Sequence, residues 1–273
     1  MNISRPGRPG IPGLLAAGSL FAGVVVLLLM LALQGPPGQA PLPAGSTEVW
    51  TTDSDERATE REGFALWGTD RTGGPLRWDA CAPVLFVLST VDAPPSAADD
   101  VQQALDMLAA ASGLSLVLDG TSDERAHTGR PLVERDGEGW RWMPVLIAWA
   151  GPDATDLPLT ALDRGLAVPV AVRDGDREGL VTGQVVINAS RTDLVPGFGD
   201  RSDAVGATLL HELGHVLGLD HVDDIAQVMS EDPGSGPVRF GDGDLAGLRA
   251  VGADAGCNPA PAPESGRGLV ARP

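Results

Sequence analysis

The chain has 273 residues, a length that fits one large domain or two small ones. Its formal net charge of −18 at pH 7 argues against nucleic acid as a partner and against adhesion to anionic lipid surfaces. Hydrophobic residues make up 43% of the chain, and one N-terminal segment raises that share.

That segment is residues 14–33, twenty residues in which Ser19 is the only polar side chain. At about 1.5 Å per residue, a helix of this length spans a hydrocarbon core of about 30 Å, so we predict one transmembrane helix. Arg5 and Arg8 precede it. Because basic residues stay on the cytoplasmic side, residues 1–13 should be cytoplasmic and everything after the helix should lie outside the cytoplasm.

The predicted helix is either an uncleaved membrane anchor or a signal peptide that is removed. A secretory signal usually has an apolar region of about 7–15 residues, and the best small-residue cleavage site, at 38–40, is followed by Pro41. We therefore favour an uncleaved signal anchor in the cell membrane. The alternative is a removed signal peptide, which would leave a secreted protein.

Residues 34–63 are predicted to be a linker. Residues 34–45 are rich in Pro, Gly and Ala and show no apolar period, as expected of a stalk that holds a domain away from the membrane. Residues 46–63 are charged and irregular, and they are either an extended linker or a small pro-segment.

The folded domain is expected to span residues 64–258. Five short apolar runs predict strands at residues 84–88, 114–118, 145–149, 166–170 and 185–188. Between the first two, Ser96 can cap a helix that runs to about Ser112 and stops at Gly113. The apolar face of this helix is formed by Val101, Ala104, Leu105 and Leu108.

Two more helices are predicted after the strands. One should begin near Ser202 and pack its apolar face against the sheet. Gly206 and Gly214 each cost about 1 kcal/mol relative to Ala inside a helix, so close packing is expected at both. The other covers residues 241–250, and residues 259–273, rich in Pro and Ala, should form a disordered tail.

The first of these helices carries the sequence His-Glu-Leu-Gly-His-Val-Leu-Gly-Leu-Asp-His at residues 211–221. His211 and His215 lie four residues apart, so both can direct a ring nitrogen to one point about 2.1 Å away, the usual zinc–nitrogen distance. Gly218 can adopt φ > 0 and end the helix, and the turned chain can return His221 as a third ligand. Three protein ligands leave one position of a tetrahedral ion open, which is typical of a catalytic zinc site.

This motif, HExxHxxGxxH followed by Met229, resembles the signature of the metzincin zinc proteases. The residues at 218–221, followed by Asp223 and Asp224, are most similar to the matrixins, the matrix-metalloprotease-like branch. The resemblance implies an α+β, zincin-like catalytic domain with a twisted, mixed five-stranded sheet, an active-site helix and a C-terminal helix. It also implies a methionine-containing turn at Met229 beneath the metal and a substrate-pocket wall at residues 230–236.

The implied activity is that of a zinc-dependent endopeptidase acting on protein or peptide substrates. One Zn2+ would be held by His211, His215 and His221, and Glu212 would act as general base on a zinc-bound water. Chance matches to HExxH alone are common, but the longer pattern with its vacant position favours a catalytic metal. Two rivals remain open: a metal-binding or adhesion module without turnover, and a metallohydrolase with a non-peptide substrate.

Substrate contacts follow from the resemblance as well. Pro169 lacks an N–H, which places residues 166–170 on an edge of the sheet. In the family the edge strand aligns the peptide, so Leu166, Ala167 and Val168 are expected substrate contacts, together with Ser230. An edge strand that only faces solvent is the alternative.

Cys81 and Cys257 lie near the two ends of the domain, and outside the cytoplasm such a pair is expected to form a disulfide bond. A zinc-masking role for Cys81 is disfavoured, because its surroundings lack the arginine and glycine pattern of matrixin pro-segments. Asp174, Asp176 and Glu178, or Asp193, Asp200 and Asp203, offer oxygen ligands for a calcium ion in addition to zinc. The alternative is that these charges form a solvated surface, and we assign no calcium site. We expect a monomer.

The chain also departs from the family. It contains no tyrosine, so the tyrosine ligand or oxyanion donor of some metzincins cannot exist here. His127 is the only histidine outside the motif, which leaves no second, histidine-rich zinc site, and we expect it to be solvated. Val222 and Ser230 replace residues more usual at their positions, and this puts the substrate preference in doubt.

Overall fold

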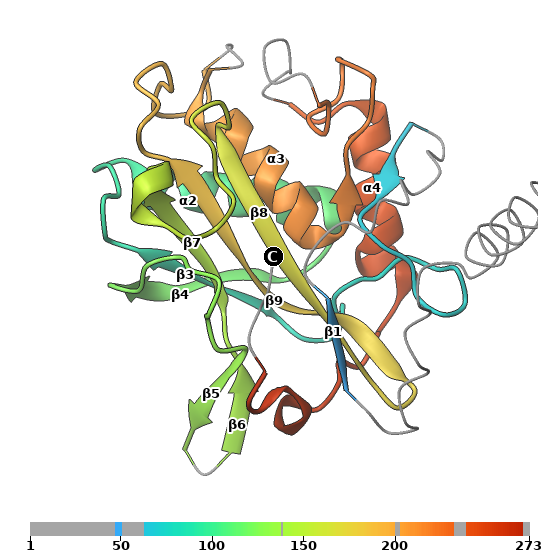
Figure 1. The fold of residues 1–273 in the computed structure, drawn as a ribbon. Helices are drawn as coiled ribbons and strands as arrows, with labels where there is room; N and C mark the ends of the chain where they lie inside the picture. The colour runs from blue at the N-terminus through green and yellow to red at the C-terminus, as the bar shows by residue number, and fades with distance from the viewer. Residues whose placement is uncertain (1–46, 51–62, 138, 200–202, 232–238, 270–273) are drawn as a thin grey trace, which may run out of the picture. The chain divides into compact units, whose positions relative to one another are not determined.

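The computed structural model describes residues 47–50, 63–137, 139–199, 203–231 and 239–269 (Figure 1). The expected transmembrane helix at residues 14–33 and most of the linker that follows lie outside this range. Within the described residues, no helix is both long and apolar enough to cross a membrane.

A mixed sheet of six strands forms the centre of the fold, in the order β1-β8-β9-β7-β3-β4. The five predicted strands are all present in it, as β3 (Val84–Ser89), β4 (Leu116–Ser122), β7 (Val145–Ala150), β8 (Gly165–Asp174) and β9 (Arg177–Asn188). Strands β4, β3, β7 and β9 run parallel to one another, whereas β8 pairs with β9 in the antiparallel sense. The mixed α+β class is therefore confirmed.

The sixth strand, β1 (Glu48–Trp50), comes from residues expected to be linker. It pairs antiparallel with β8, and only with Ala171, Val172 and Arg173 at the far end of that strand. Three residues are too few to show an alternating pattern, which is why this strand escapes prediction. Within the described chain, residues 165–170 of β8 have β9 as their only strand partner.

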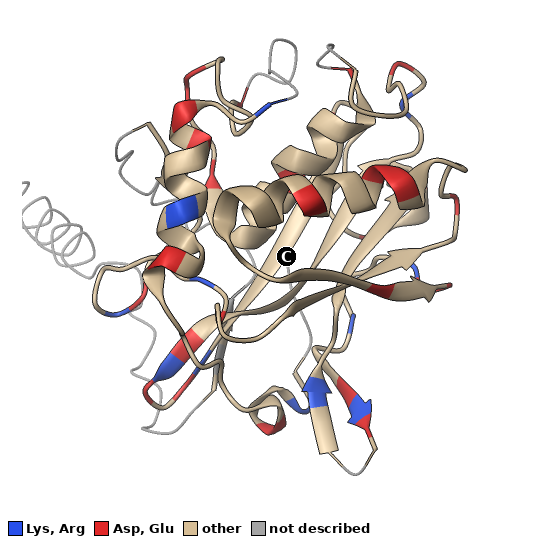
Figure 2. Ribbon diagram, turned by 180° about the vertical axis from the view of Figure 1, so that it is seen from behind, with Lys and Arg blue, Asp and Glu red and all other residues tan. Residues whose placement is uncertain are grey.

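Helices α2 (Ala97–Ser112) and α3 (Val205–Leu217) pack against one face of the sheet, and α4 (Asp242–Val251) packs against these two helices (Figure 1). Val185 and Ile187 of β9 point into the core beneath these helices, whereas Val186 between them points to a smaller core on the opposite face. That opposite core includes Leu157 and Leu159 from the connection between β7 and β8. The acidic residues are spread over helices, strands and loops of the described chain (Figure 2).

The helix boundaries differ from the predictions in two details. Gly113 ends α2 with φ 72°, as predicted, but Ser96 makes no capping hydrogen bond and its buried hydroxyl has no partner. Helix α3 begins at Val205, because Ala204 is extended and bridges to Val195. The expected capping residue Ser202 lies outside the described residues.

Close packing at the two α3 glycines is confirmed. A Cβ atom at Gly206 would lie 2.5 Å from the Phe198 ring, and one at Gly214 would overlap the sulfur of Met229. Glycine at these two positions lets the Phe198 ring and the Met229 sulfur pack directly against the helix backbone, and a larger residue would displace them. This packing offsets the low helix propensity of glycine.

The segment after residue 258 is not the disordered tail that its composition suggests. Ala260 and Leu269 pack against a small core, and the Trp142 indole donates a hydrogen bond to the Pro261 carbonyl at 3.0 Å. Trp142 belongs to an unpredicted hairpin formed by β5 (Val133–Asp136) and β6 (Gly139–Trp142). The tail is ordered from 259 to 269 because this hairpin offers it an apolar surface.

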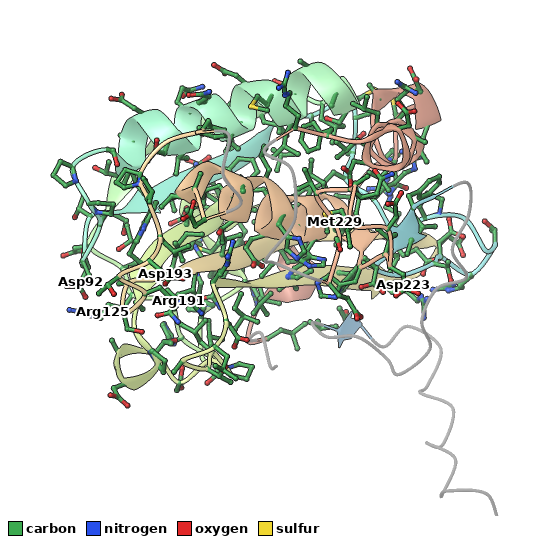
Figure 3. The ribbon with its side chains drawn as sticks, turned by 90° about the horizontal axis from the view of Figure 1, so that it is seen from above. Asp92, Arg125, Arg191, Asp193, Asp223 and Met229 are labelled. Carbon is green, nitrogen blue, oxygen red and sulfur yellow. A yellow bond between two sulfur atoms is a disulfide. The ribbon has the colours of Figure 1, made fainter. Side chains whose placement is uncertain are left out.

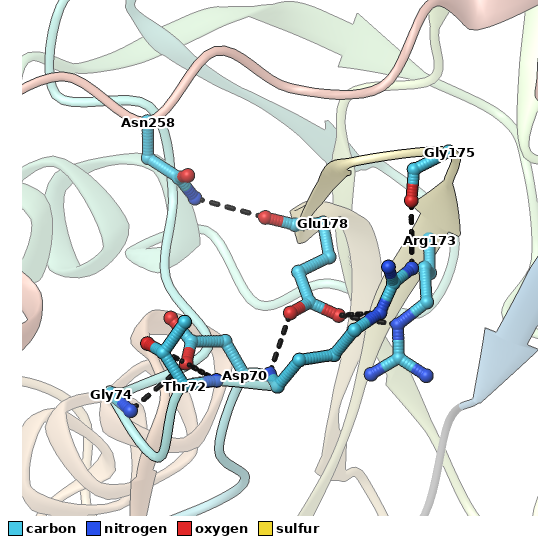
Figure 4. A network of polar contacts seen from close by, with 8 residues as sticks. Asp70, Thr72, Gly74, Arg173, Gly175, Glu178 and Asn258 are labelled. Atoms are coloured by element: carbon cyan, nitrogen blue, oxygen red, sulfur yellow. Dashed lines mark hydrogen bonds and ion pairs between the residues drawn. The ribbon is translucent and has the colours of Figure 1, made fainter.

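Glu178 joins three parts of the chain (Figure 4). Its carboxylate accepts a hydrogen bond from the Arg71 N–H at 2.7 Å and pairs with the Arg173 guanidinium, and its carbonyl accepts one from the Asn258 side chain at 3.1 Å. Arg71 also donates to the Gly175 carbonyl at 2.7 Å. The network fixes the loop at residues 67–76 and the C-terminal segment to the β8–β9 hairpin.

The predicted disulfide bond joins Cys81 to Cys257, with a Cα–Cα distance of 5.2 Å and a sequence separation of 176 residues. A crosslink over so long a loop restricts the unfolded chain, and loop-closure entropy gives it about 4–5 kcal/mol.

We therefore expect the double variant Cys81→Ala/Cys257→Ala to lose about 4–5 kcal/mol of unfolding free energy. Urea denaturation of the oxidised wild type, the reduced wild type and the variant measures this loss. Reduced wild type should match the variant, and equal stability of all three would contradict the expectation.

Candidate metal centre

Helix α3 carries two of the three motif histidines, and its end determines where the third one lies. The helix stops at Gly218, whose φ of 108° belongs to the left-handed region, and the Gly218 N–H bonds to the carbonyls of Gly214 and His215. A Cβ at Gly218 would lie 2.8 Å from the Leu76 carbonyl oxygen. The chain then runs through the short strand β10 (Leu219–Asp220), which pairs with β2 (Ala65–Leu66), to His221.

The three histidine rings converge as predicted. The Nε2 atom of His211 lies 3.2 Å from that of His215 and 3.1 Å from that of His221, and the remaining pair is 3.1 Å apart. A tetrahedral ion with metal–nitrogen distances of about 2.0–2.1 Å separates its ligands by about 3.3–3.4 Å. These residues therefore form a group that could hold a metal ion.

Backbone carbonyls determine which ring nitrogen carries the proton. His211 Nδ1 lies 2.8 Å from the Val228 oxygen, and His215 Nδ1 lies 2.9 Å from the Leu219 oxygen. A carbonyl oxygen can only accept, so both Nδ1 atoms must be donors. In the neutral rings, both Nε2 atoms then present lone pairs to each other across 3.2 Å.

Protonation does not relieve this repulsion at neutral pH. Burial, together with the neighbouring histidines, lowers the pKa of His211 to about 4 and that of His215 well below its ordinary value. Rings that stay neutral and direct their lone pairs at one point are suited to a divalent cation.

Glu212 is held against β8. Its side chain is 7% exposed, and the Ala167 N–H donates a hydrogen bond to its carboxylate. Burial, and to a lesser extent nearby Asp163, raises the pKa of Glu212 to about 8, although the Ala167 N–H opposes both effects. A Cβ at Gly165 would lie 2.8 Å from both Cγ and Oε1 of Glu212, so glycine is what leaves room for the carboxylate.

Gly165→Ala is therefore expected to move Glu212 while leaving the histidines in place. If the carboxylate is catalytic, kcat should fall by about 10-fold to 100-fold, because small displacements of reacting groups are costly. Bound zinc per chain should not change. The matched control is Gly199→Ala, where no atom within 4 Å would meet the new Cβ. Equal kcat in both variants would contradict the role given to Gly165.

Met229 lies beside α3, 3% exposed, with its sulfur against Gly214 (Figure 3). The preceding residue, Val228, supplies the carbonyl that orients His211. The Met229 carbonyl in turn accepts a hydrogen bond from Val222 N–H at 2.9 Å. The turn predicted at Met229 is thus part of the support of the three rings.

Sequence reasoning missed Asp244 as part of this support. The Asp244 carboxylate accepts hydrogen bonds from the backbone N–H groups of Val228 at 2.6 Å, Met229 at 3.1 Å and Gly241 at 2.8 Å. It is 1% exposed; burial raises its pKa, and the three donors oppose that shift. Nothing in the local sequence indicates this long-range contact, because the partners of Asp244 lie 15 and 16 residues away along the chain.

The structure places the expected substrate residues on different surfaces. Ala167 lies on the α3 side of β8, whereas Leu166 and Val168 pack against the core on the other side. All three belong to the part of β8 that β1 does not cover. Ser230 is 4% exposed and bridges to Val222, and most of the expected pocket wall after it lies outside the described residues.

Two of the acidic groups considered for calcium, Glu178 and Asp193, have arginine partners. Glu178 pairs with arginines, and Arg191 donates to both carboxylate oxygens of Asp193, lowering the pKa of Asp193 to about 2. Among the described residues, the only other group with metal-ligand spacing is Asp79 with the two cysteines, whose sulfurs are joined in the disulfide. His127 is only partly exposed, and Gln184 binds its backbone.

Three converging histidine rings, a buried carboxylate beside them and a strand edge without a partner among the described residues thus lie close together, on α3, on the turn that follows it and on β8. This arrangement can bind a cation, hold a proton acceptor near it and align an extended chain. Comparison with protein-family models and with curated proteins found no match for the chain.

Proposed function

We propose that the chain is a zinc-dependent endopeptidase of the metzincin, matrixin-like type. One observation carries the proposal: the Nε2 atoms of the three motif histidines converge to within 3.2 Å of one another. Two of these rings are held in the tautomer that leaves Nε2 unprotonated. Neutral imidazoles in tetrahedral spacing favour zinc among the common divalent ions.

His211, His215 and His221 would hold the metal, with Val228 and Leu219 fixing the orientation of the first two rings. A zinc ion bound there supplies Lewis acidity, which lowers the pKa of a coordinated water and polarises a carbonyl group. Met229, packed against Gly214, and Asp244 would hold the segment whose Val228 carbonyl orients the His211 ring.

A cation held by the three histidines would lower the pKa that burial raises, so that Glu212 is ionised. Glu212 would then remove a proton from the attacking water and deliver it to the nitrogen of the leaving amine. The proton acceptor is kept in place by the Ala167 N–H and by the space at Gly165. Because the reaction is direct attack by water, no covalent enzyme intermediate is needed.

The uncovered part of β8 would align the substrate. An extended peptide can pair its main chain with a free strand edge, and side-chain pockets then select among sequences. Residues 165–170 of β8 lie next to Glu212 and have no other strand partner in the described chain. This edge favours a peptide over a small non-peptide substrate.

The test uses the full chain purified in detergent, with metal analysis and digestion of a peptide library. We expect about one zinc per chain, loss of cleavage with a chelator and recovery when zinc is restored. A chain without zinc would overturn the metal site. Zinc without peptide cleavage would instead support a silent binding module or a hydrolase with another substrate.

We also propose that residues 14–33 anchor the protein in the membrane, with the catalytic domain outside the cytoplasm. Membrane fractions washed with alkaline carbonate should retain the chain, and a protease added to intact cells should cut the domain. Recovery of a shortened chain in the medium would show instead that the N-terminal segment is removed.

A further inference from the structure

Asn188 is a buried polar residue at the end of β9, 1% exposed, on the sheet face opposite α3. Its Nδ2 donates hydrogen bonds to the carbonyls of Thr160 at 3.1 Å and Asp163 at 2.8 Å. Its Oδ1 accepts from the backbone N–H of Ser190 at 3.0 Å and from the Ser190 hydroxyl at 2.6 Å. The side chain therefore uses both of its donors and both of its acceptor sites.

The contacts of Asn188 fix the chain immediately before β8. Besides the side-chain bonds to Thr160 and Asp163, the Asn188 backbone N–H donates to the Arg164 carbonyl at 2.9 Å. One residue of β9 thus holds three positions in the five residues that precede Gly165. The apolar anchors of this loop, Leu157 and Leu159, lie further upstream, and Arg191 adds one hydrogen bond to the Leu162 carbonyl at 2.6 Å, so Asn188 supplies most of the polar contacts that hold residues 160–164 to β9.

The start of β8 has little freedom to move without disturbing Glu212. A Cβ at Gly165 would come within 2.8 Å of the Glu212 Oε1 atom, and the Ala167 N–H donates to the same carboxylate. A shift of β8 toward α3 would push the carboxylate, and a shift away would remove its hydrogen bond.

We infer that Asn188 is a positioning residue for Glu212, acting from the opposite face of the sheet through residues 160–165. Its effect on turnover rests on the proposed peptidase function. Its effect on the placement of β8 does not, so the two can be tested separately.

Gln184 provides a matched control on the same strand and the same face. It is also 1% exposed, and its side chain also holds a loop, through bonds of 3.0 Å to the backbone N–H and carbonyl of His127. That loop precedes the β5–β6 hairpin and does not lead into Gly165. Loss of a buried amide at position 184 should therefore destabilise the fold without moving Glu212.

The experiment compares Asn188→Asp with Gln184→Glu in the full chain. Each change keeps the shape of the side chain and places a carboxylate oxygen against a backbone carbonyl. For Asn188→Asp we expect kcat to fall by about 10-fold to 100-fold, with KM within about twofold and zinc content unchanged. For Gln184→Glu we expect a comparable drop in Tm but a kcat within about twofold of the wild type.

Hydrogen exchange provides a measurement that does not depend on activity. Amides of residues 160–167 should exchange faster in Asn188→Asp, with and without zinc, and should be unchanged in Gln184→Glu. If Asn188→Asp does not fold, Asn188→Ser removes both long bonds with a smaller electrostatic cost and is expected to show the same pattern. Unchanged exchange at 160–167, or an equal loss of kcat in both variants, would overturn the inference. Absence of peptidase activity in the wild type would count against the proposed function alone.

Discussion

Replacing Glu212 by Gln is expected to lower kcat for peptide hydrolysis by about 10²-fold to 10⁴-fold, the usual contribution of a general base. The amide has the size of the carboxylate and can still accept the Ala167 hydrogen bond through its oxygen. It cannot take up a proton at neutral pH. The zinc content should stay at about one per chain, because Glu212 lies beside the three rings without belonging to the ligand set.

Steady-state kinetics on one cleaved peptide, with metal analysis of the same preparations, measures this effect. Glu264→Gln is the matched control, since Glu264 is exposed in the C-terminal segment far along the chain from the site. The control should keep wild-type kcat. Full activity in Glu212→Gln would exclude the residue as the base, and loss of zinc would show that it acts on the metal centre itself.

The second large effect is expected at Asp244, and it concerns stability. In Asp244→Ala the N–H groups of Val228, Met229 and Gly241 lose their common acceptor. A buried donor left without a partner costs about 1–3 kcal/mol, so we expect the unfolding free energy to fall by about 3–5 kcal/mol. Because Val228 also supplies the carbonyl that orients His211, the affinity for zinc should fall as well.

Urea denaturation with and without zinc, and competition with a chelator of known affinity, measure both losses. Asp242→Ala is the control, because Asp242 opens the same helix but its side chain is exposed. It should change stability by less than about 1 kcal/mol. Equal stabilities of the two variants would show that the Asp244 contacts contribute little.

The convergence of the three histidines could be predicted because these residues are close together in the chain. Spacing of four residues on a helix puts His211 and His215 on one face, and a glycine that can take positive φ returns His221. The structure has these rings within 3.2 Å of each other and Gly218 at φ 108°. In the same way, apolar spacing and Gly113 were sufficient to define α2.

The support around this centre comes from residues that are distant in sequence. Asp244 contacts Val228, which is sixteen residues away in the chain, and Asn188 contacts Thr160, which is twenty-eight residues away. Strand β1 pairs with β8 although its sequence predicts a linker. Neither a carboxylate nor an amide has a local pattern that indicates which backbone groups it will meet. The order of residues 259–269 likewise depends on Trp142, more than a hundred positions earlier.

Local sequence patterns therefore establish the kind of site: the helical repeat sets the relative positions of two imidazoles and a carboxylate on α3, and the turn at Gly218 returns the third imidazole, His221. The contacts that hold the site are visible only in the tertiary structure. Gly165 lies against Glu212, Asp244 accepts a hydrogen bond from the Met229 N–H, and Asn188 holds the loop that leads into β8. The physical reason is that these contacts form when the sheet and helices pack, and packing partners are set by the whole chain.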